Sequence, residues 1–317
     1  MTEPAARFTT RTSFDRRSFL SISAAGASAL VTRAANADNR RLYFDLSLVE
    51  TSLSRSLKAG QLKHQDFVRV AREKFDIEAV EYASQFFPDG SPPTDEHLKT
   101  LNKQAARYGV RQLLIAIAGD VRIADAVPSK RERALRDARR WIDAARSLGC
   151  HSVRINPTST GNPADQSGRA SDSVSTLCEY AEVKKINVLL GNYGGLSADA
   201  SWIAGIVNAV DTPCCRTLPR IRNLMKDSDL DDLARLVPLA KGLTVDTTTY
   251  TPGGDEAASN LARVLMTVHE AGYRGYVGVN YRGRKLDEFS GIRASIRRLE
   301  QIRDTRESTA GDFGWQR

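Results

Sequence analysis

Short apolar or β-branched runs recur along the chain, and each is followed by a segment with the period of an amphipathic helix. The runs begin near Leu42, Ile77, Gln112, Ser152, Asn187, Cys214, Gly242 and Gly275. Successive starts lie 27 to 40 residues apart, which is the length of a strand, a helix and two loops. Strands that alternate with helices imply a parallel sheet. Eight such units predict an α/β fold of the (β/α)8 TIM-barrel type, which typically takes ~250 residues.

Helix boundary signals agree with this pattern. Thr94 precedes Asp95 and Glu96 and is a plausible N-cap, and Gly109 stops the same helix. A doubly wound open sheet is the alternative fold. That fold typically has a glycine-rich phosphate loop after its first strand. The segment that follows the first predicted strand here, Val49-Glu50-Thr51-Ser52, contains no glycine.

The N-terminal segment 1–37 has the features of a twin-arginine export signal. Asp15-Arg16-Arg17-Ser18-Phe19-Leu20 is the motif, an uncharged stretch rich in Ala and Ser follows, and Ala35-Asn36-Ala37 is an A-x-A cleavage site. The alternative is an amphipathic N-terminal helix with a chance arginine pair. The signal predicts removal of residues 1–37, a barrel over residues 38–305, a loose polar tail over residues 306–317, and a periplasmic or otherwise extracytoplasmic location.

Composition narrows the class of protein. The 317 residues are 41% hydrophobic and 26% charged with a net charge of +8, which is ordinary for a globular protein. The predicted mature chain has 280 residues and a charge of +5 that is spread along the sequence. We therefore expect no nucleic-acid partner and, since no apolar run reaches the ~18 residues that a membrane helix needs, no stable membrane insertion after signal removal.

The familiar catalytic motifs are missing from the sequence. It contains no G-x-S-x-G elbow, no P-loop and no G-x-G-x-x-G. His64 and His97 lie at or beside helix starts, where we expect them to be solvated. Four cysteines are too few for a disulfide scaffold, although Cys150 and Cys178 could pair in an oxidising compartment, while the adjacent pair Cys214 and Cys215 is expected to be structural.

In a TIM barrel the site lies where the strands end. Polar side chains follow most of the predicted strands, and about half of them should point inward because side chains alternate along a strand. They are Asp45, Ser47, Glu81, Arg154, Asn156, Asn192, Tyr193, Arg220, Arg222, Asn223, Asp246, Thr247, Asn280, Tyr281 and Arg282.

Several of these strand ends lie in phrases that resemble the sugar phosphate isomerase/epimerase family, the xylose-isomerase-like TIM barrels. The resemblance runs from Phe44 to about Leu299. Its strongest phrases are FDIEAVEY at 75–82, AARSLGCHSVRIN at 144–156, NYGGLS at 192–197, TLPRIRN at 217–223 and AGYRGYVGVNYRG at 271–283. The resemblance implies a barrel that acts on a carbohydrate.

The departures from the family pattern bear on its metal. Family enzymes hold a divalent metal with carboxylates and His, and two glutamates serve as ligands and proton-transfer groups. At the matching positions this chain has Gly191, Arg220 and Asn280, while Thr244, followed by Asp246, stands where many members have His. Glycine and asparagine supply no negatively charged ligand, and arginine repels a cation. We therefore expect no metal and no other cofactor, unless Asp45, Glu81 and Asp246 rebuild a metal site.

The same changes make the mouth of the barrel more positive. Arginine binds carboxylate or phosphate bidentately, so the pocket could accept a uronate, sugar acid or sugar phosphate. The alternative is that the arginines pair with Asp45, Glu81 or Asp246 and hold the mouth closed. The candidate substrate-binding residues are Arg154, Asn156, Asn192, Arg220, Asn223, Asn280 and Arg282.

Two functions remain open at this point. In the first, the barrel converts a carbohydrate by isomerase-, epimerase- or lyase-type chemistry without a metal, with Glu81 or Asp246 as base, Tyr193 as acid and an arginine at the developing oxyanion. In the second, it is a catalytically silent barrel, a pseudoenzyme that binds a carbohydrate or a partner protein. The sequence does not decide between them, nor does it fix the oligomeric state.

Overall fold

The computed structural model describes residues 44–119, 122–157, 159, 161–222, 228–248 and 261–309. The predicted signal segment 1–37, Asn223 and residues 310–317 lie outside the described residues. The described residues belong to one compact unit of the chain, Tyr43–Arg317.

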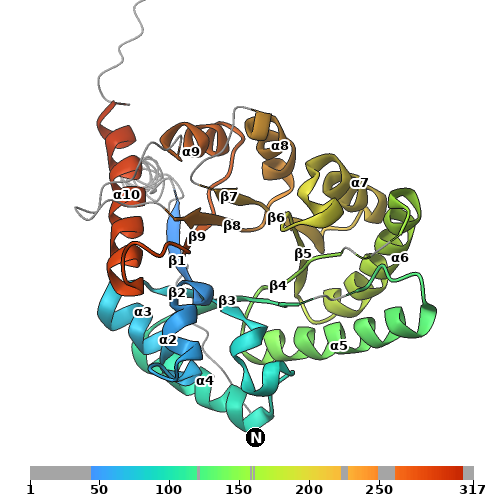
Figure 1. Ribbon diagram of the computed structural model, residues 1–317, viewed down its shortest axis with the longest axis horizontal. Coiled ribbons are helices and arrows are strands. Elements are labelled where there is room, and N and C mark those ends of the chain that lie inside the picture. Colours follow the sequence, from blue (N-terminus) through green and yellow to red (C-terminus); the bar gives the residue numbers. More distant parts are fainter. Residues whose placement is uncertain are drawn as a thin grey trace, which may run out of the picture. The chain divides into compact units, whose positions relative to one another are not determined.

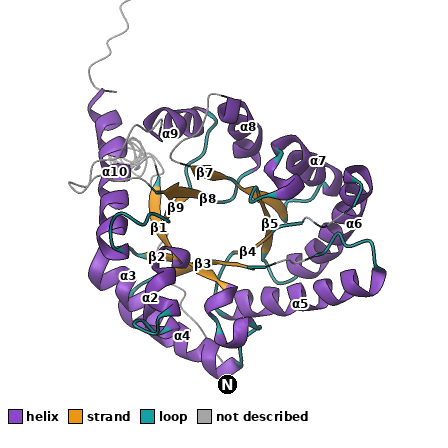
Figure 2. Ribbon diagram, in the orientation of Figure 1, coloured by secondary structure: helices purple, strands orange, loops and turns teal. Residues whose placement is uncertain are grey.

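Nine strand segments form one parallel sheet that curves into a nearly closed barrel (Figures 1 and 2). They are β1 (Asp45–Val49), β2 (Ala79–Ala83), β3 (Arg111–Ala116), β4 (Ser152–Ile155), β5 (Asn187–Gly191), β6 (Cys215–Leu218), β7 (Arg220–Arg222), β8 (Leu243–Thr247) and β9 (Tyr276–Tyr281). Each predicted run contains or borders one of these strands, and β1 pairs in parallel with both β2 and β9. The predicted TIM barrel is therefore confirmed, and the open doubly wound alternative is wrong.

The ninth segment arises from a break at Pro219. The predicted run from Cys214 corresponds to β6, which pairs with β5, whereas β7, which pairs with β8, was not predicted. Proline has no N–H to donate to the sheet, so Pro219 separates the two segments. The carbonyl of Pro219 still accepts a hydrogen bond from the Thr244 N–H at 2.9 Å. The two segments together therefore take the place of one barrel strand.

Helices surround the barrel on its outer side (Figure 2). They are α2 (Ser54–Lys58), α3 (Phe67–Phe75), α4 (Asp95–Tyr108), α5 (Pro128–Ser147), α6 (Pro163–Glu182), α7 (Ala200–Val210), α8 (Ser228–Leu236), α9 (Leu261–Glu270) and α10 (Glu288–Thr309). The predicted caps of α4 are confirmed: the Thr94 side chain accepts from the His97 N–H, and Gly109 takes a left-handed conformation. The helix α10 continues past the predicted barrel boundary at residue 305.

Alternation along the strands separates two layers of side chains. Val153, Ile155 and Val188 belong to the large apolar core shared with the helices, while Leu114, Leu189 and Leu218 form a separate small cluster. This second set takes the opposite face of its strands, which is the barrel interior. Arg154 pairs in register with Leu189, so the same alternation turns Arg154 inward.

A buried polar chain lies beside β1, where solvated histidines were expected. His64 Nδ1 is 2.9 Å from His97 Nε2, and His64 Nε2 is 3.3 Å from the Glu50 carboxylate. Burial, followed by the neighbouring His97, lowers the pKa of His64 to about 3. The expectation that His64 is solvated is wrong, because His97 of α4 and Phe87 of the segment after β2 lie against its ring.

The cysteines are all buried and free. Cys150 and Cys178, which the sequence allowed to pair, do not form a disulfide, because the Cys178 thiol instead hydrogen-bonds with Cys214 and Cys215. Cys178 lies on α6, which packs against β6, where Cys215 begins the strand. No described helix is long and apolar enough to span a bilayer.

Candidate functional site

A cavity of about 1030 Å³ opens where the strands end. Its described walls come from the segments that follow β1 to β5 and from β9 with the loop beyond it. The polar and charged residues on these walls are Thr51, Ser54, Arg55, Lys58, Gln85, Arg154, Asn156, Tyr193, Asn280, Tyr281, Arg282, Arg284, Lys285, Asp287 and Glu288. Since TIM-barrel sites form at the carboxyl ends of the strands, this cavity is the candidate site.

Asp246 is the centre of an ion-pair network beside the cavity. The Arg220 guanidinium donates to Asp246 Oδ2 through Nε, at 2.6 Å, and through Nη2. Asn280 Nδ2 donates to Asp246 Oδ1 at 2.7 Å, and Arg282 Nε lies 3.9 Å from Oδ2. The carboxylate is only 4% exposed. The negative charge of Asp246 is therefore compensated by its neighbours, and both of its carboxylate oxygens already accept hydrogen bonds.

The network extends to two further strand ends. Asn280 Oδ1 accepts from the Thr51 hydroxyl at 2.8 Å, and Asn192 Oδ1 accepts from the Arg220 N–H at 2.8 Å. These contacts join the ends of β1, β5, β7, β8 and β9. Arg220 thus pairs with an acid at the mouth, as the alternative interpretation of the arginines expects.

Tyr193 carries two guanidinium groups on its ring. Arg154 Cζ is 4.2 Å and Arg220 Cζ is 4.8 Å from the ring centroid, distances typical of cation–π contacts. A Cβ atom at Gly191 would lie 2.5 Å from the Tyr193 ring and 3.0 Å from Arg154 Cδ. The glycine therefore provides the space in which this stack is built.

Glu81 lies one layer below the cavity, inside the barrel. Its Cα pairs with Val49, and its Oε1 accepts from the Ser47 hydroxyl at 2.7 Å. Gly278 leaves room for it, because a Cβ there would lie 2.5 Å from Glu81 Oε1. Burial raises the pKa of Glu81 to about 7, against the opposing effects of Ser47 and Arg154. The carboxyl is thus poised near neutral pH but does not line the cavity.

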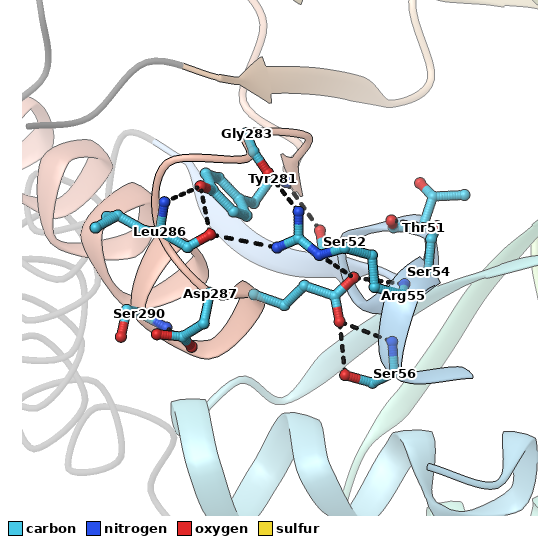
Figure 3. Close-up of polar contacts among 11 residues, drawn as sticks. Thr51, Ser52, Ser54, Arg55, Ser56, Tyr281, Gly283, Leu286, Asp287 and Ser290 are labelled. Atoms are coloured by element: carbon cyan, nitrogen blue, oxygen red, sulfur yellow. Dashed lines mark hydrogen bonds and ion pairs between the residues drawn. The ribbon is translucent and has the colours of Figure 1, made fainter. Parts of the chain in front are cut away.

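A second polar cluster fixes the loop between β9 and α10 (Figure 3). Glu288 accepts from the N–H groups of Arg55 and Ser56 at 2.6 and 2.9 Å, which are free donors in the first turn of α2. Arg55 in return donates to the carbonyls of Gly283 and Leu286 at 2.8 and 3.3 Å. We call Arg55 with Glu288 the loop clamp, since it holds the segment that carries Arg284 and Lys285.

The charges on the cavity wall are unequal. Its described lining includes six cationic side chains and two acidic ones, Asp287 and Glu288. Glu288 belongs to the loop clamp, and Asp287 Oδ1 accepts from the Ser290 N–H at 2.9 Å. Arg154 makes none of the ion pairs formed by the other mouth arginines, and its buried Nε has no hydrogen-bond partner. The described wall is therefore cationic.

The structure brings most of the predicted site residues together. Arg154, Asn156, Tyr193, Asn280 and Arg282 line the main cavity. Asn192 and Arg220 line a neighbouring space of about 120 Å³, with Arg222. Asp246 joins the two groups, Glu81 lies beneath them, and Asn223 falls outside the described residues.

The residues at the mouth do not fit the divalent metal that the resemblance implies. No group of three or more His, Cys, Asp or Glu side chains within the described segments could hold a metal ion. Asp246, on β8, already accepts hydrogen bonds from a guanidinium and an amide. A glutamate at Gly191 would clash with Tyr193. A hard cation needs several free anionic oxygens, which this set of side chains does not offer.

Comparison with known protein families shows which family the chain belongs to. The family model for the xylose isomerase-like TIM barrel matches residues 69–302, and the chain belongs to this family. No curated protein matches the sequence.

Solved structures show the same fold at low sequence identity. The 3-keto-D-glucoside 4-epimerase YcjR from E. coli aligns with a TM-score of 0.64 and 14% identity, over 82% of this chain and 100% of its own. An L-ribulose 3-epimerase gives 0.67 and 11%, over 86% and 99%. The D-psicose 3-epimerase from Clostridium cellulolyticum H10, solved with D-tagatose, gives 0.65 and 13%, over 82% and 98%.

Sequence reasoning missed the loop clamp. Arg55 and Glu288 are 233 residues apart, and neither follows a predicted strand directly. The signal in the sequence is Leu53, which stands at the N-cap of α2 and has no side chain that can accept a hydrogen bond. The N–H groups of the first turn therefore need acceptors from elsewhere.

Proposed function

We propose that this chain is an exported member of the family that binds a carbohydrate carrying a negative charge, without a divalent metal. The observation that carries the proposal is the cationic cavity wall, and above all Arg154, which lies at the floor of the cavity without an ion-pair partner among the described contacts. The epimerases with this fold act on sugars, which supports a carbohydrate as the ligand.

The wall offers suitable partners for a sugar acid or a sugar phosphate. Arg154, Arg282 and Lys285 are donors for an anionic group. Asn156, Asn280 and Tyr193 can exchange hydrogen bonds with hydroxyl groups. A volume of about 1030 Å³ is also ample for a monosaccharide, because small-molecule sites typically measure roughly 300–1,000 Å³.

Binding is the function that this arrangement supports best. A proton abstraction would need a free carboxylate or other base within hydrogen-bond reach of the substrate carbon. Both described carboxylates on the wall are hydrogen-bonded by backbone N–H groups, and Asp246 is held by Arg220 and Asn280.

Conversion of the sugar is the second candidate, and Glu81 favours it. A carboxyl with a pKa near 7 suits a general base at neutral pH. Tyr193 would then serve as acid and Arg154 would stabilise a developing oxyanion. A substrate would have to reach Glu81 past the Arg154–Tyr193 stack.

Calorimetric titration of the mature chain tests the proposal. We expect glucuronate, gluconate or glucose 6-phosphate to bind at least ~10-fold more tightly than glucose, and less tightly at high salt because ions screen the attraction. Arg154→Met should remove this preference, whereas Arg107→Met is the matched control. Arg107 also stacks on a tyrosine, Tyr108, but lies away from the cavity. Equal or absent responses to acidic and neutral sugars would refute the proposal.

A turnover assay separates the two candidates. Incubation of the same sugars with the mature chain, followed by product analysis, should show no conversion if the barrel only binds. Turnover that is lost in Glu81→Gln while ligand binding remains would establish the second candidate instead.

Export is tested independently. The Arg16-Arg17 pair directs the chain through the twin-arginine route in this proposal. Replacement of both by lysine should keep the full-length chain in the cytoplasmic fraction, while the unaltered chain appears in the periplasm with residues 1–37 removed. Equal distribution of both forms would contradict an export signal.

A further inference from the structure

We propose that the ligand is an α-hydroxy acid of the aldonate type, with its carboxylate on Arg154 and the adjacent hydroxyl on Asn156. This inference rests on the proposed function and narrows it, because sugar phosphates and uronate rings carry a different group beside the charge.

Arg154 supplies the first half of the argument. It comes from the interior face of β4, and its guanidinium stacks on Tyr193 at 4.2 Å. Its Nε is buried and has no hydrogen-bond partner, and the ion pairs described at the mouth use Arg220, Arg282 and Arg55 instead. Ring stacking leaves the edge of a guanidinium free to donate. Glu81, inside the barrel, is an electrostatic neighbour of Arg154, but the buried Nε still lacks a hydrogen-bond acceptor. An anionic ligand in the cavity can supply that acceptor.

Asn156 supplies the second half. It follows β4 directly, two positions after Arg154, and both residues line the main cavity. Its Oδ1 is buried and accepts no hydrogen bond within the described structure. Buried polar groups are normally paired, so the amide oxygen needs a donor from a ligand.

A charged donor and an acceptor that lie two positions apart in the chain and line the same cavity select the chemistry of the ligand. A carboxylate only accepts, and therefore fits Arg154 but cannot satisfy Asn156 Oδ1. A hydroxyl on the neighbouring carbon donates, and completes the pair. In a sugar phosphate the atoms beside the phosphate are an ester oxygen and a CH₂ group, neither of which donates. A neutral sugar would offer the free Arg154 Nε no charged acceptor.

Titrations with D-gluconate and 2-deoxy-D-gluconate test the inference, because the two acids differ only in the hydroxyl next to the carboxylate. We expect gluconate to bind ~10-fold or more tightly than its 2-deoxy analogue, as for a buried hydrogen bond that is lost. In Asn156→Ala the two acids should bind equally. In Arg154→Met both should weaken by a similar factor, so that their ratio is kept.

Controls separate this inference from the proposed function. Thermal unfolding of each variant and the Arg107→Met control verify that the barrel is intact. If acids bind more tightly than glucose but gluconate and its 2-deoxy analogue bind equally, the inference is wrong and the proposed function remains. If the ratio persists in Asn156→Ala, the assignment of the hydroxyl is likewise wrong. If no acid binds, both fail.

Discussion

Replacing Arg220 with methionine tests the ion-pair network at the mouth most sharply. The substitution keeps much of the side-chain volume but removes the guanidinium that donates to Asp246. The carboxylate, 4% exposed, would keep the Asn280 hydrogen bond and the more distant Arg282. The ionised Asp246 carboxylate therefore loses the positive charge that offsets most of its desolvation.

The expected cost follows from burial. Removal of one partner from a buried ion pair typically costs ~3–5 kcal/mol, because the other charge remains desolvated. We expect about 3 kcal/mol in the free energy of unfolding, the lower end of that range, since Arg282 is half-exposed and can approach Asp246. With an unfolding entropy of ~2.1 cal/mol/K per residue, this corresponds in a mature chain of 280 residues to a decrease of roughly 5 °C in Tm.

Urea unfolding and thermal denaturation of the mature chain give the measurement. The double variant Arg220→Met/Asp246→Asn should recover most of the loss, because it leaves no charge to compensate. Arg216→Met is the matched control, since Arg216 donates to the backbone carbonyls of Thr212 and Cys215 and should cost about 1 kcal/mol. A loss below 1 kcal/mol in Arg220→Met, or no recovery in the double variant, would refute the reasoning.

Three further predictions concern neighbouring groups. Gly191→Ala places a Cβ 2.5 Å from the Tyr193 ring and should cost ~1–3 kcal/mol by overpacking, measured by urea unfolding; an unchanged stability would contradict the tight fit. Burial raises the pKa of Glu81 from 4.5 to about 7, so the contribution of this residue to stability is full below pH ~4.5 and is lost as the pH rises towards 7. The difference in unfolding free energy between wild type and Glu81→Gln should therefore fall by about 3 kcal/mol across that range. A difference that does not change with pH would exclude the raised pKa. Arg55→Met removes the hydrogen bonds to Gly283 and Leu286 and should speed amide exchange in residues 283–287, whereas protection equal to wild type would show that the loop clamp is dispensable.

The barrel was predictable because its signals are local. Each strand is a short apolar run, and a glycine such as Gly109 marks the end of a helix. The break at Pro219 is also a local effect, but the run predicted from Cys214 ends at Leu218, so the short strand β7 beyond the proline was not predicted. The missing N–H of proline separates β6 from β7.

The site was predictable only to the level of which strand ends meet. The alternation of side chains turns Arg154 and Glu81 inward, but the layer at which each lies depends on the stagger between strands, and this places Glu81 below the cavity beside Gly278. The contact between Glu288 and the first turn of α2 depends on how a distant loop returns to β1. His64 was misjudged for a similar reason, since its burial is produced by α4 and not by its own segment.

We propose that the mouth of this barrel binds an acidic sugar through cationic side chains and without a metal. The most direct test is a calorimetric titration of the mature chain with D-gluconate, once in the presence of a chelator and once with added Mn²⁺. We expect the same dissociation constant in both titrations. Binding that appears only with Mn²⁺, together with a stoichiometric ion retained by the protein, would contradict it.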